Sequence, residues 1–277
     1  RSVGKVDKLE KNLKIRKNKI KGNIGIAHTR WATHGKPANR NAHPHISNNA
    51  VGVVHNGIIE NYLELKEIQI KQGYKFTSDT DAEVVAHSVE FAMQSSNTLL
   101  QSVQKAINTF DGAYGLGVIS PKYPNTIIAT RKGSPLVIGI GNNGNYIASD
   151  QMALLSVTRK FIFLEEGDVA ELKLKKIIIY DKDGRKVNRV IKTSRIKEGQ
   201  VDIGSYQHFM QKEIFEQPQA IRDTLESRIT KESVLVSAFG HKARDVFKNI
   251  KRVQIVACGT SYNAGLVAKY WLEDISK

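Results

Sequence analysis

The residues whose types best suit chemistry begin in segment 29–35, where Thr33 and His34 closely follow Arg30. A guanidinium presents a planar fork of N–H donors that grips a carboxylate at two points, and neighbouring hydroxyl and imidazole groups complete such a grip. The alternative is a loop in which Arg30 pairs with a local acidic residue and Trp31 covers the core. The segment by itself leaves both interpretations open.

A second segment, 55–61, contains Asn56 and Gly57 directly after an apolar run. Asn-Gly in this position usually forms a tight turn between strands. An Asn side-chain amide beside an unshielded glycine N–H is also a suitable pair of donors for an oxyanion that develops during attack on an amide. The geometry of the folded chain has to decide between a turn and an oxyanion hole.

A third segment, 78–83, contains Asp79 and Asp81 just ahead of a region with helical periodicity. Ser, Asp and Thr are ordinary N-cap residues, so a purely structural role is one interpretation. The functional interpretation is that one carboxylate turns inward and binds an ammonium group. An arginine for an α-carboxylate together with an aspartate for an α-amino group is what an amino-acid substrate requires.

These segments are expected to be positioned by two strands and by three helices that follow them in the sequence. Short apolar runs predict strands at 23–28 and 51–54, and the second run ends at the Asn-Gly pair. Helical spacing of apolar residues predicts three helices, at 59–73, from Asp81 onward, and at 98–110. The second of these helices is expected to bury Val84, Val85, Phe91 and either His87 or Ser88.

After Asp111 the pattern changes to short β-rich runs, at 113–119, 126–130, 136–140, 145–148, 161–164, 169–172 and 177–180. Asp183 and Gly184 then supply a hairpin turn before a last run at 187–191. Strands, a few central helices and many further strands indicate two sheets with helices outside them, because alternating βαβ units are missing. The fold class predicted is α+β, a layered sandwich.

A polar, glycine-containing segment at 193–205 is typical of a linker. Beyond it, 208–226 is predicted to be helical despite Pro218, and 253–257 is predicted to be a strand. That strand leads into a glycine turn and a helix carrying Val267, Ala268 and Trp271. Strand, glycine turn and helix are the opening of a second, α/β domain.

Composition narrows the function classes. The net charge is +15, but the densest basic run, 5–21, lacks aromatic residues for base stacking, so nucleic-acid binding is not expected. Apolar stretches such as 135–140 are far shorter than the roughly 20 residues of a membrane span, so no membrane association is expected. The single cysteine permits no internal disulfide, which suits a reducing cytoplasm.

Several ordered motifs together resemble one family. They lie at 26–35, 42–45, 54–61, 111–115, 161–168, 211–218 and 257–263. From residue 22 onward the chain resembles the glutamine:fructose-6-phosphate aminotransferases. The resemblance implies a four-layer αββα sandwich of the N-terminal-nucleophile hydrolase type at 1–195, a type 2 glutamine amidotransferase (glutaminase) domain. A linker at 196–205 and the beginning of an α/β sugar-isomerase domain at 206–277 would follow.

The resemblance also implies a reaction. L-Glutamine is hydrolysed, and the ammonia converts fructose 6-phosphate to glucosamine 6-phosphate in amino-sugar biosynthesis. The residues implied to hold glutamine are Arg30, Thr33, His34, Gly57 and Asp81. Asn56 and Gly57 would form the oxyanion hole, and Trp31 matches the gate of an internal ammonia channel. No cofactor and no metal are implied.

In the second domain, Thr260 and Ser261 match residues that approach the sugar phosphate, which is consistent with anion binding at a helix N-terminus. The family suggests a homodimer through the isomerase half when the protein is full length. The nucleophile of the family is the thiol of its N-terminal residue, whose own α-amino group serves as the base. Residue 1 here is Arg1, so we expect this chain to lack the nucleophile and to be inactive.

The only thiol, that of Cys258, is expected at the end of a buried strand in the other domain, where a small apolar role is usual. Two rival interpretations remain. One is another type 2 glutamine amidotransferase, such as amidophosphoribosyltransferase or asparagine synthetase, which the motif at 258–263 disfavours. The other is a non-catalytic module that binds glutamine.

Overall fold

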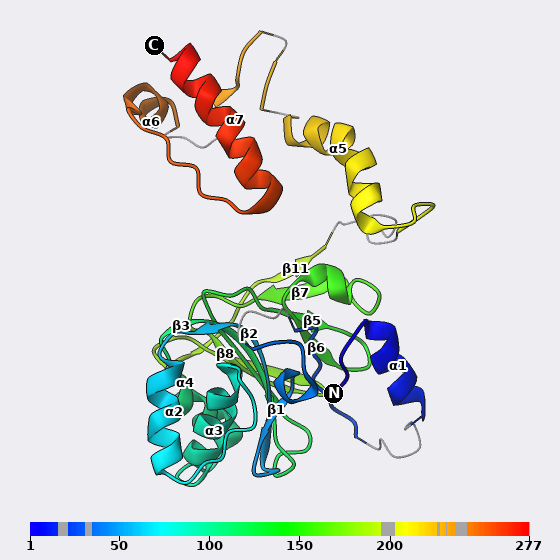
Figure 1. The fold of residues 1–277 in the computed structure, drawn as a ribbon, viewed down its shortest axis with the longest axis vertical. Helices are drawn as coiled ribbons and strands as arrows, with labels where there is room; N and C mark the ends of the chain where they lie inside the picture. Colours follow the sequence, from blue (N-terminus) through cyan, green and yellow to red (C-terminus); the bar gives the residue numbers. More distant parts are fainter. Residues whose placement is uncertain are drawn as a thin grey trace. The chain divides into compact units, whose positions relative to one another are not determined.

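The computed structural model describes residues 1–15, 22–30, 35–194, 203–225, 228–230, 232–236 and 243–276. The chain divides into two compact units, Arg1–Val201 and Asp202–Lys277. Mixed α and β structure with antiparallel sheets characterises the first unit (Figure 1). Within the described residues, no helix combines the length and the apolar character that crossing a bilayer demands.

The larger sheet of the first unit has seven strands in the order β1-β2-β3-β4-β8-β9-β10. Their bounds are β1 His45–Ser47, β2 Val51–Ile59, β3 Gly112–Ile119, β4 Ile127–Lys132, β8 Val169–Lys173, β9 Lys176–Tyr180 and β10 Lys186–Val187. Every pair is antiparallel, and the long β2–β3 ladder runs from the Gly52–Ile119 pair to the Ile59–Gly112 pair. This ladder is the frame on which the candidate site is built.

The smaller sheet has four antiparallel strands in the order β11-β7-β5-β6. Their bounds are β5 Val137–Ile140, β6 Asn145–Ala148, β7 Lys160–Phe163 and β11 Ile191–Thr193. Strand alternation separates the two faces of the larger sheet, since Ile128 joins one apolar cluster and its neighbour Ala129 joins another. The second cluster combines Ala129, Ala170 and Leu172 with Ile138 and Ile162 of the smaller sheet, so the sheets pack face to face.

Three helices cover the other face of the larger sheet: α2 Tyr62–Lys71, α3 Ala82–Met93 and α4 Leu99–Ile107 (Figure 1). They match the three predicted helices, and Gly73, with φ of +92°, follows the end of α2 as expected. Val84, Val85 and His87 are buried. Phe91 is 47% exposed, contrary to expectation, because it faces a hollow between α2 and α3.

The fourth layer of the expected αββα sandwich is nearly absent from the described residues. The outer face of the smaller sheet is covered by a single 3-10 turn, η3 Gln151–Leu154, whose Leu154 packs on Val137 and Phe161. A second short 3-10 helix, η2 Asn39–Asn41, precedes β1. The helix α1 Val6–Ile15 buries none of its residues and lies away from the α2–α4 layer (Figure 1).

Two expected strands of the first unit are wrong. Residues 23–28 form no strand; Ile26 instead packs on the larger sheet, where side chains at Gly52 and Gly117 would meet it. The run 187–191 divides between sheets, since Val187 pairs with Ile179 in the larger sheet and Ile191 pairs with Ile162 in the smaller. The chain must cross between the sheets there.

An ion pair fixes that crossing point. Arg189 donates two hydrogen bonds to the fully buried carboxylate of Asp168, from Nε at 2.9 Å and Nη2 at 2.7 Å. The Arg189 Nη1 atom lies 2.9 Å from Oε2 of Glu165. Asp168 also accepts the backbone N–H of Glu165 at 2.7 Å, so the buried carboxylate is satisfied by the turn before β8 and by the crossing segment.

The second unit contains helices α5 Phe209–Leu225, α6 Ala243–Asn249 and α7 Gly259–Ile275. Helix α5 runs through Pro218, as expected. The strand expected at 253–257 is wrong: the segment is exposed and pairs with no strand in the described part of this unit. Ile255 packs against Gly265 of α7 instead, because an isolated extended run has no ladder partner. The expected linker at 196–205 lies largely outside the described residues.

Candidate functional site

The Asn56–Gly57 pair does not form the turn at which the strand was expected to end. It lies inside β2, where Asn56 pairs with Gly115 and Gly57 pairs with Tyr114. Gly57 has φ of +135°, which side-chain-bearing residues rarely adopt. A Cβ atom at Gly57 would lie 2.1 Å from the Ala113 carbonyl oxygen. Glycine therefore allows the two strands to approach closely without ending the ladder.

The amide of Asn56 reaches toward the smaller sheet. Its Nδ2 donates to Oγ of Ser149, the residue after β6, over 3.4 Å. Ser134 also approaches this position, since its Oγ would lie 2.8 Å from a Cβ at Gly57. An amide donor and a glycine backbone thus lie together on one strand with only small side chains beside them.

Asp81 turns its side chain inward. Although it occupies the N-cap position of α3, its side chain makes no capping bond. Its Oδ2 instead accepts the backbone N–H of Ile59 at 2.9 Å and lies 3.8 Å from Nδ1 of His55. The residue is 5% exposed. The carboxylate therefore points toward β2, the strand that carries Gly57, and does not cap α3.

Glu83 fixes the turn that carries Asp81. Its carboxylate accepts the backbone N–H and the hydroxyl of Thr77 and of Ser78, at distances from 2.6 to 3.1 Å. Burial opposes ionisation of Glu83, but these hydrogen bonds outweigh it and lower its pKa. The turn before α3 is thus held by a buried carboxylate that reaches back from the first turn of the helix.

Four histidines gather beneath this site, and no role was assigned to them from the sequence. The His28 and His43 rings lie 4.5 Å apart, the His43 and His45 rings 4.9 Å apart, and Nδ1 of His43 accepts the His55 backbone N–H at 3.2 Å. Burial lowers the pKa of His43 to about 2 and that of His45 to about 4, and lowers the pKa of His55. Burial also lowers the pKa of His28, so all four rings are uncharged at neutral pH. The sequence feature that could have indicated this cluster is that each of these histidines lies within one of the family motifs.

The Arg30 side chain folds back on its own loop. Its Nη2 donates to the Gly35 carbonyl at 2.8 Å, and its Nη1 lies 3.5 Å from the Lys36 carbonyl. Trp31, Thr33 and His34 lie outside the described residues. Among the site residues expected from the sequence, Asn56 and Gly57 lie on β2, Asp81 is anchored to the same strand at Ile59, and Arg30 lies on a separate loop.

The expected phosphate-binding residues belong to the second unit. Thr260 and Ser261 lie exposed in the first turn of α7. Cys258 precedes them at the N-cap and is exposed, so its expected position at the end of a buried strand is wrong. The strand was expected to shield it, but the segment before it is irregular.

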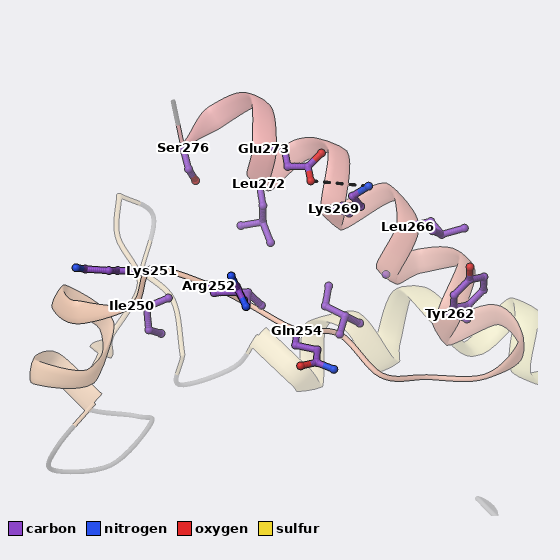
Figure 2. Close-up of a pocket in the computed structure, with 13 residues that line it drawn as sticks. Ile250, Lys251, Arg252, Gln254, Tyr262, Leu266, Lys269, Leu272, Glu273 and Ser276 are labelled. Carbon is purple, nitrogen blue, oxygen red and sulfur yellow. Dashed lines mark ion pairs between the residues drawn. The ribbon is translucent and has the colours of Figure 1, made fainter.

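A pocket of about 570 Å³ lies along α7, between the helix and residues 250–255 (Figure 2). Its wall includes Tyr262, Leu266 and Leu272, and the Lys269 Nζ atom lies 3.8 Å from Oε1 of Glu273 at its rim. Neither Thr260 nor Ser261 lines it. Across the described ranges, no group of three or more His, Cys, Asp or Glu side chains could hold a metal ion.

Comparison with known proteins shows which proteins this chain resembles. Residues 28–156 match the glutamine amidotransferase domain. The glutamine–fructose-6-phosphate aminotransferase (isomerizing) of Haemophilus influenzae is 50% identical over 276 residues, 100% of this chain and 45% of the relative. The enzyme of the same name from Shewanella oneidensis is 51% identical over 274 residues, 99% of this chain and 45% of the relative.

Among solved structures, the glutamine phosphoribosylpyrophosphate amidotransferase from B. subtilis, complexed with ADP and GMP, gives a TM-score of 0.43 at 24% identity. The likeness covers 60% of this chain and 34% of that one, and one this weak carries no argument. The sequence relatives are far closer. Spanning just under half of their length, the chain is similar from end to end to these glutamine–fructose-6-phosphate aminotransferases, and at 28–156 it matches the glutamine amidotransferase domain.

Proposed function

We propose that the first unit binds L-glutamine and promotes hydrolysis of its amide, and that the full-length protein passes the ammonia to fructose 6-phosphate to give glucosamine 6-phosphate. The observation that carries the glutamine site is the inward carboxylate of Asp81, held on the strand that carries Gly57. About half of all residues are shared with enzymes named for this reaction. The rival amidotransferases of the same type are therefore disfavoured.

In this proposal each group acts on one part of glutamine. The Asp81 carboxylate receives the α-ammonium group, while Arg30, with Thr33 and His34, receives the α-carboxylate. The Gly57 backbone and the Asn56 amide donate to the oxygen of the scissile amide as negative charge develops. Burial keeps the neighbouring histidines uncharged, so they do not compete with the ammonium group for Asp81.

The wider organisation belongs to the same proposal. Residues 1–195 would be a glutaminase domain of the N-terminal-nucleophile hydrolase type, 196–205 a linker and 206–277 the beginning of a sugar-isomerase domain. There, Thr260 and Ser261 at the start of α7 would approach the phosphate of the sugar. Trp31 would gate the path of ammonia. A homodimer acting in the cytoplasm completes the proposal.

Calorimetric titration of the chain with L-glutamine tests the binding site. Asp81→Asn keeps an acceptor for the Ile59 N–H but loses the charge, so we expect affinity for L-glutamine to fall roughly tenfold or more. The matched control is Asp181→Asn, because Asp181 also accepts backbone N–H bonds, from Asp183 and Arg185, in a distant hairpin. No binding by the unaltered chain, or equal binding by the Asp81 variant, would overturn the site.

The reaction is tested in the full-length protein, by measuring glucosamine 6-phosphate formed from L-glutamine and fructose 6-phosphate. With ammonium salts in place of glutamine, Asp81→Asn should leave product formation unchanged, because only the glutamine site has been altered. If the protein binds glutamine but forms no amino sugar, the proposed glutamine site stands and the proposed reaction is overturned.

A further inference from the structure

We propose that Asn41 and Asp79 form a clamp that holds the Arg30 loop and the Asp81 turn at the spacing that an L-α-amino acid requires. Neither clamp residue was singled out for this task by the sequence motifs. The proposal rests on the proposed glutamine site, whose two charged contacts, Arg30 and Asp81, lie on the two segments that the clamp joins. Asn41 and Asp79 are positioning residues, and neither is assigned a contact with the substrate.

The Asn41 side chain is the centre of the clamp. It is fully buried, at 0% exposure. Its Oδ1 accepts the backbone N–H of Asp79 at 2.9 Å, and its Nδ2 donates to Oδ2 of Asp79 at 3.1 Å. The same Nδ2 donates to the Lys36 carbonyl at 3.0 Å. One amide therefore ties two segments that are 38 residues apart in the sequence.

Asp79 completes the clamp from the other side. Its Oδ2 also accepts from Nη2 of Arg40 at 2.7 Å, although this ion pair is half exposed. Hydrogen bonds from Asn41 and then Arg40 lower the pKa of Asp79. The carboxylate thus remains an acceptor at neutral pH. Its contacts with two neighbouring residues, 40 and 41, fix both position and orientation.

The clamp reaches Arg30 through the loop that follows it. The Lys36 carbonyl that accepts from Asn41 also lies 3.5 Å from Nη1 of Arg30, and Nη2 of Arg30 donates to the Gly35 carbonyl. Gly35 packs directly on the clamp: a Cβ there would lie 2.7 Å from Nδ2 of Asn41 and 2.8 Å from Cβ of Asp79. With φ of +73°, this glycine permits the close approach.

The clamp reaches Asp81 through a short, rigid turn. Asp79 lies two residues before Asp81, and the Glu83 carboxylate immobilises the turn by accepting from Thr77 and Ser78. Asp81 itself is anchored to the Ile59 N–H. A shift of the Arg30 loop relative to this turn would therefore change the distance between Arg30 and Asp81, because the turn itself cannot follow.

Such a shift matters because an amino acid carries its carboxylate and its ammonium group on one carbon. Groups that contact both must keep a fixed separation, and small errors in position weaken a charged hydrogen bond strongly. A ligand with the carboxylate alone makes no such demand. The clamp should therefore govern the preference for L-glutamine over glutaramate, which has the same carboxylate and amide but lacks the α-amino group.

The test is calorimetric titration of the chain with both ligands. Asn41→Asp removes the Nδ2 donor and places a second carboxylate opposite that of Asp79. The two carboxylates repel, so the Arg30 loop and the Asp81 turn separate. We expect affinity for L-glutamine to fall roughly tenfold and affinity for glutaramate to change less than about threefold. The double variant N41D/D79N again places a donor opposite an acceptor between residues 41 and 79, but it does not restore the hydrogen bond to the Lys36 carbonyl. It should therefore recover only part of the lost L-glutamine affinity.

Asn61→Asp is the matched control. Like Asn41, Asn61 uses both ends of its amide to join distant segments, donating to the Thr109 carbonyl at 2.9 Å and accepting the Asp111 N–H at 3.0 Å. Its substitution should leave the ratio of the two affinities unchanged. Thermal melting of every variant is followed in parallel. If Asn41→Asp fails to fold, Asp79→Ala, at a half-exposed side chain, removes the acceptor of both Asn41 and Arg40 and should lower the ratio of L-glutamine to glutaramate affinity.

The outcomes separate the two proposals. If the unaltered chain binds no L-glutamine, the glutamine site itself is overturned, and the clamp with it. If the unaltered chain prefers L-glutamine and the variants keep that preference, or lose both ligands equally, only the clamp is overturned. A lowered ratio of L-glutamine to glutaramate affinity that the double variant restores in part supports the clamp, because simple destabilisation would not depend on the α-amino group of the ligand.

Discussion

The two units of the chain differ in what their apolar side chains touch. In the first unit, three buried clusters lie between helices and sheet, between the two sheets, and beneath η3. In the second unit, Lys212 and Ala243 are the buried members of the described residues. Helix α7 carries large apolar side chains as well, yet Tyr270 and Trp271 are 69% and 65% exposed. The comparison shows that a segment can be helical without burying its apolar side chains.

The same difference applies to the candidate site residues. Asp81 in the first unit is held by a strand 22 residues earlier in the sequence, and its geometry is set by tertiary contacts. Thr260 and Ser261 in the second unit have only the local geometry of a helix start. A site whose groups come from several packed elements is precise, because each group is restrained from more than one side. The predictions below compare restrained and unrestrained features directly.

Acidification should produce the largest difference between the units. The pKa values of His43 and His45, about 2 and about 4 in the folded state, lie below the unfolded value near 6.5. The stability they contribute is complete above pH 6.5 and is lost as the pH falls, because the unfolded chain binds protons first. Between pH 7 and pH 5 we expect the first unit to lose about 4 kcal/mol.

Urea unfolding at each pH measures this loss. The two tryptophans are Trp31 and Trp271, one in each unit, so Trp271→Phe leaves a fluorescence signal from the first unit alone. His43→Asn keeps an acceptor for the His55 N–H but cannot titrate, and it should roughly halve the pH dependence. An unfolding free energy that stays level from pH 7 to pH 5 would contradict the prediction.

Two glycine substitutions compare backbone positions that both have positive φ, +135° at Gly57 and +58° at Gly259, but different surroundings. Gly57→Ala should destabilise the first unit by about 3 kcal/mol, since its Cβ would meet the Ala113 carbonyl oxygen at 2.1 Å. Gly259→Ala, with φ of +58° and nothing within 4 Å of the added atom, should cost about 1 kcal/mol. Denaturant titrations measure both values, and equal costs would contradict the assigned cause.

Two ion pairs provide the next comparison. Asp168→Asn leaves Arg189 partly paired, since Glu165 remains 2.9 Å from its Nη1, so we expect a loss of about 2 kcal/mol. Glu273→Gln breaks an exposed pair with Lys269 in α7 and should cost less than about 0.5 kcal/mol. Thermal unfolding at low and high salt distinguishes them, because salt screens only the exposed pair. A salt-sensitive effect at Asp168 would be the contrary result.

Helix caps give the smallest expected effects, with opposite signs in the two units. Thr98 caps α4 by accepting the Gln101 N–H at 3.2 Å, and Thr98→Ala should cost about 1 kcal/mol. Cys258 caps α7 without a side-chain bond, so Cys258→Ser should stabilise that helix by roughly 0.5 kcal/mol. Circular dichroism during thermal unfolding measures both. Destabilisation by the serine would show that the thiol does more than occupy the cap.

Local patterns predicted helices α2, α3 and α4 and most strands of the first unit, because amphipathic spacing and glycine stops act within a few residues. Helix α1, Val6–Ile15, was not predicted. The predicted segments for α2, α3 and α4 are confirmed within a few residues. The hydrophobic pattern gave wrong strands where tertiary contacts determine the structure of the segment. The run 187–191 is divided by the buried pair of Arg189 with Asp168, and the apolar run 253–257 has no strand beside it in the described residues.

At the candidate site, the sequence by itself determined which groups are available: a guanidinium, an Asn-Gly pair and a carboxylate in recognisable order. Tertiary structure alone decided that Gly57 lies within a ladder, that Asp81 turns inward to the Ile59 N–H, and that Asn41 joins the two loops. The physical reason is that each of these contacts is made across the sheet or between loops far apart in the sequence. Local propensity carries no information about such partners, whose hydrogen bonds form only when the core brings the segments together.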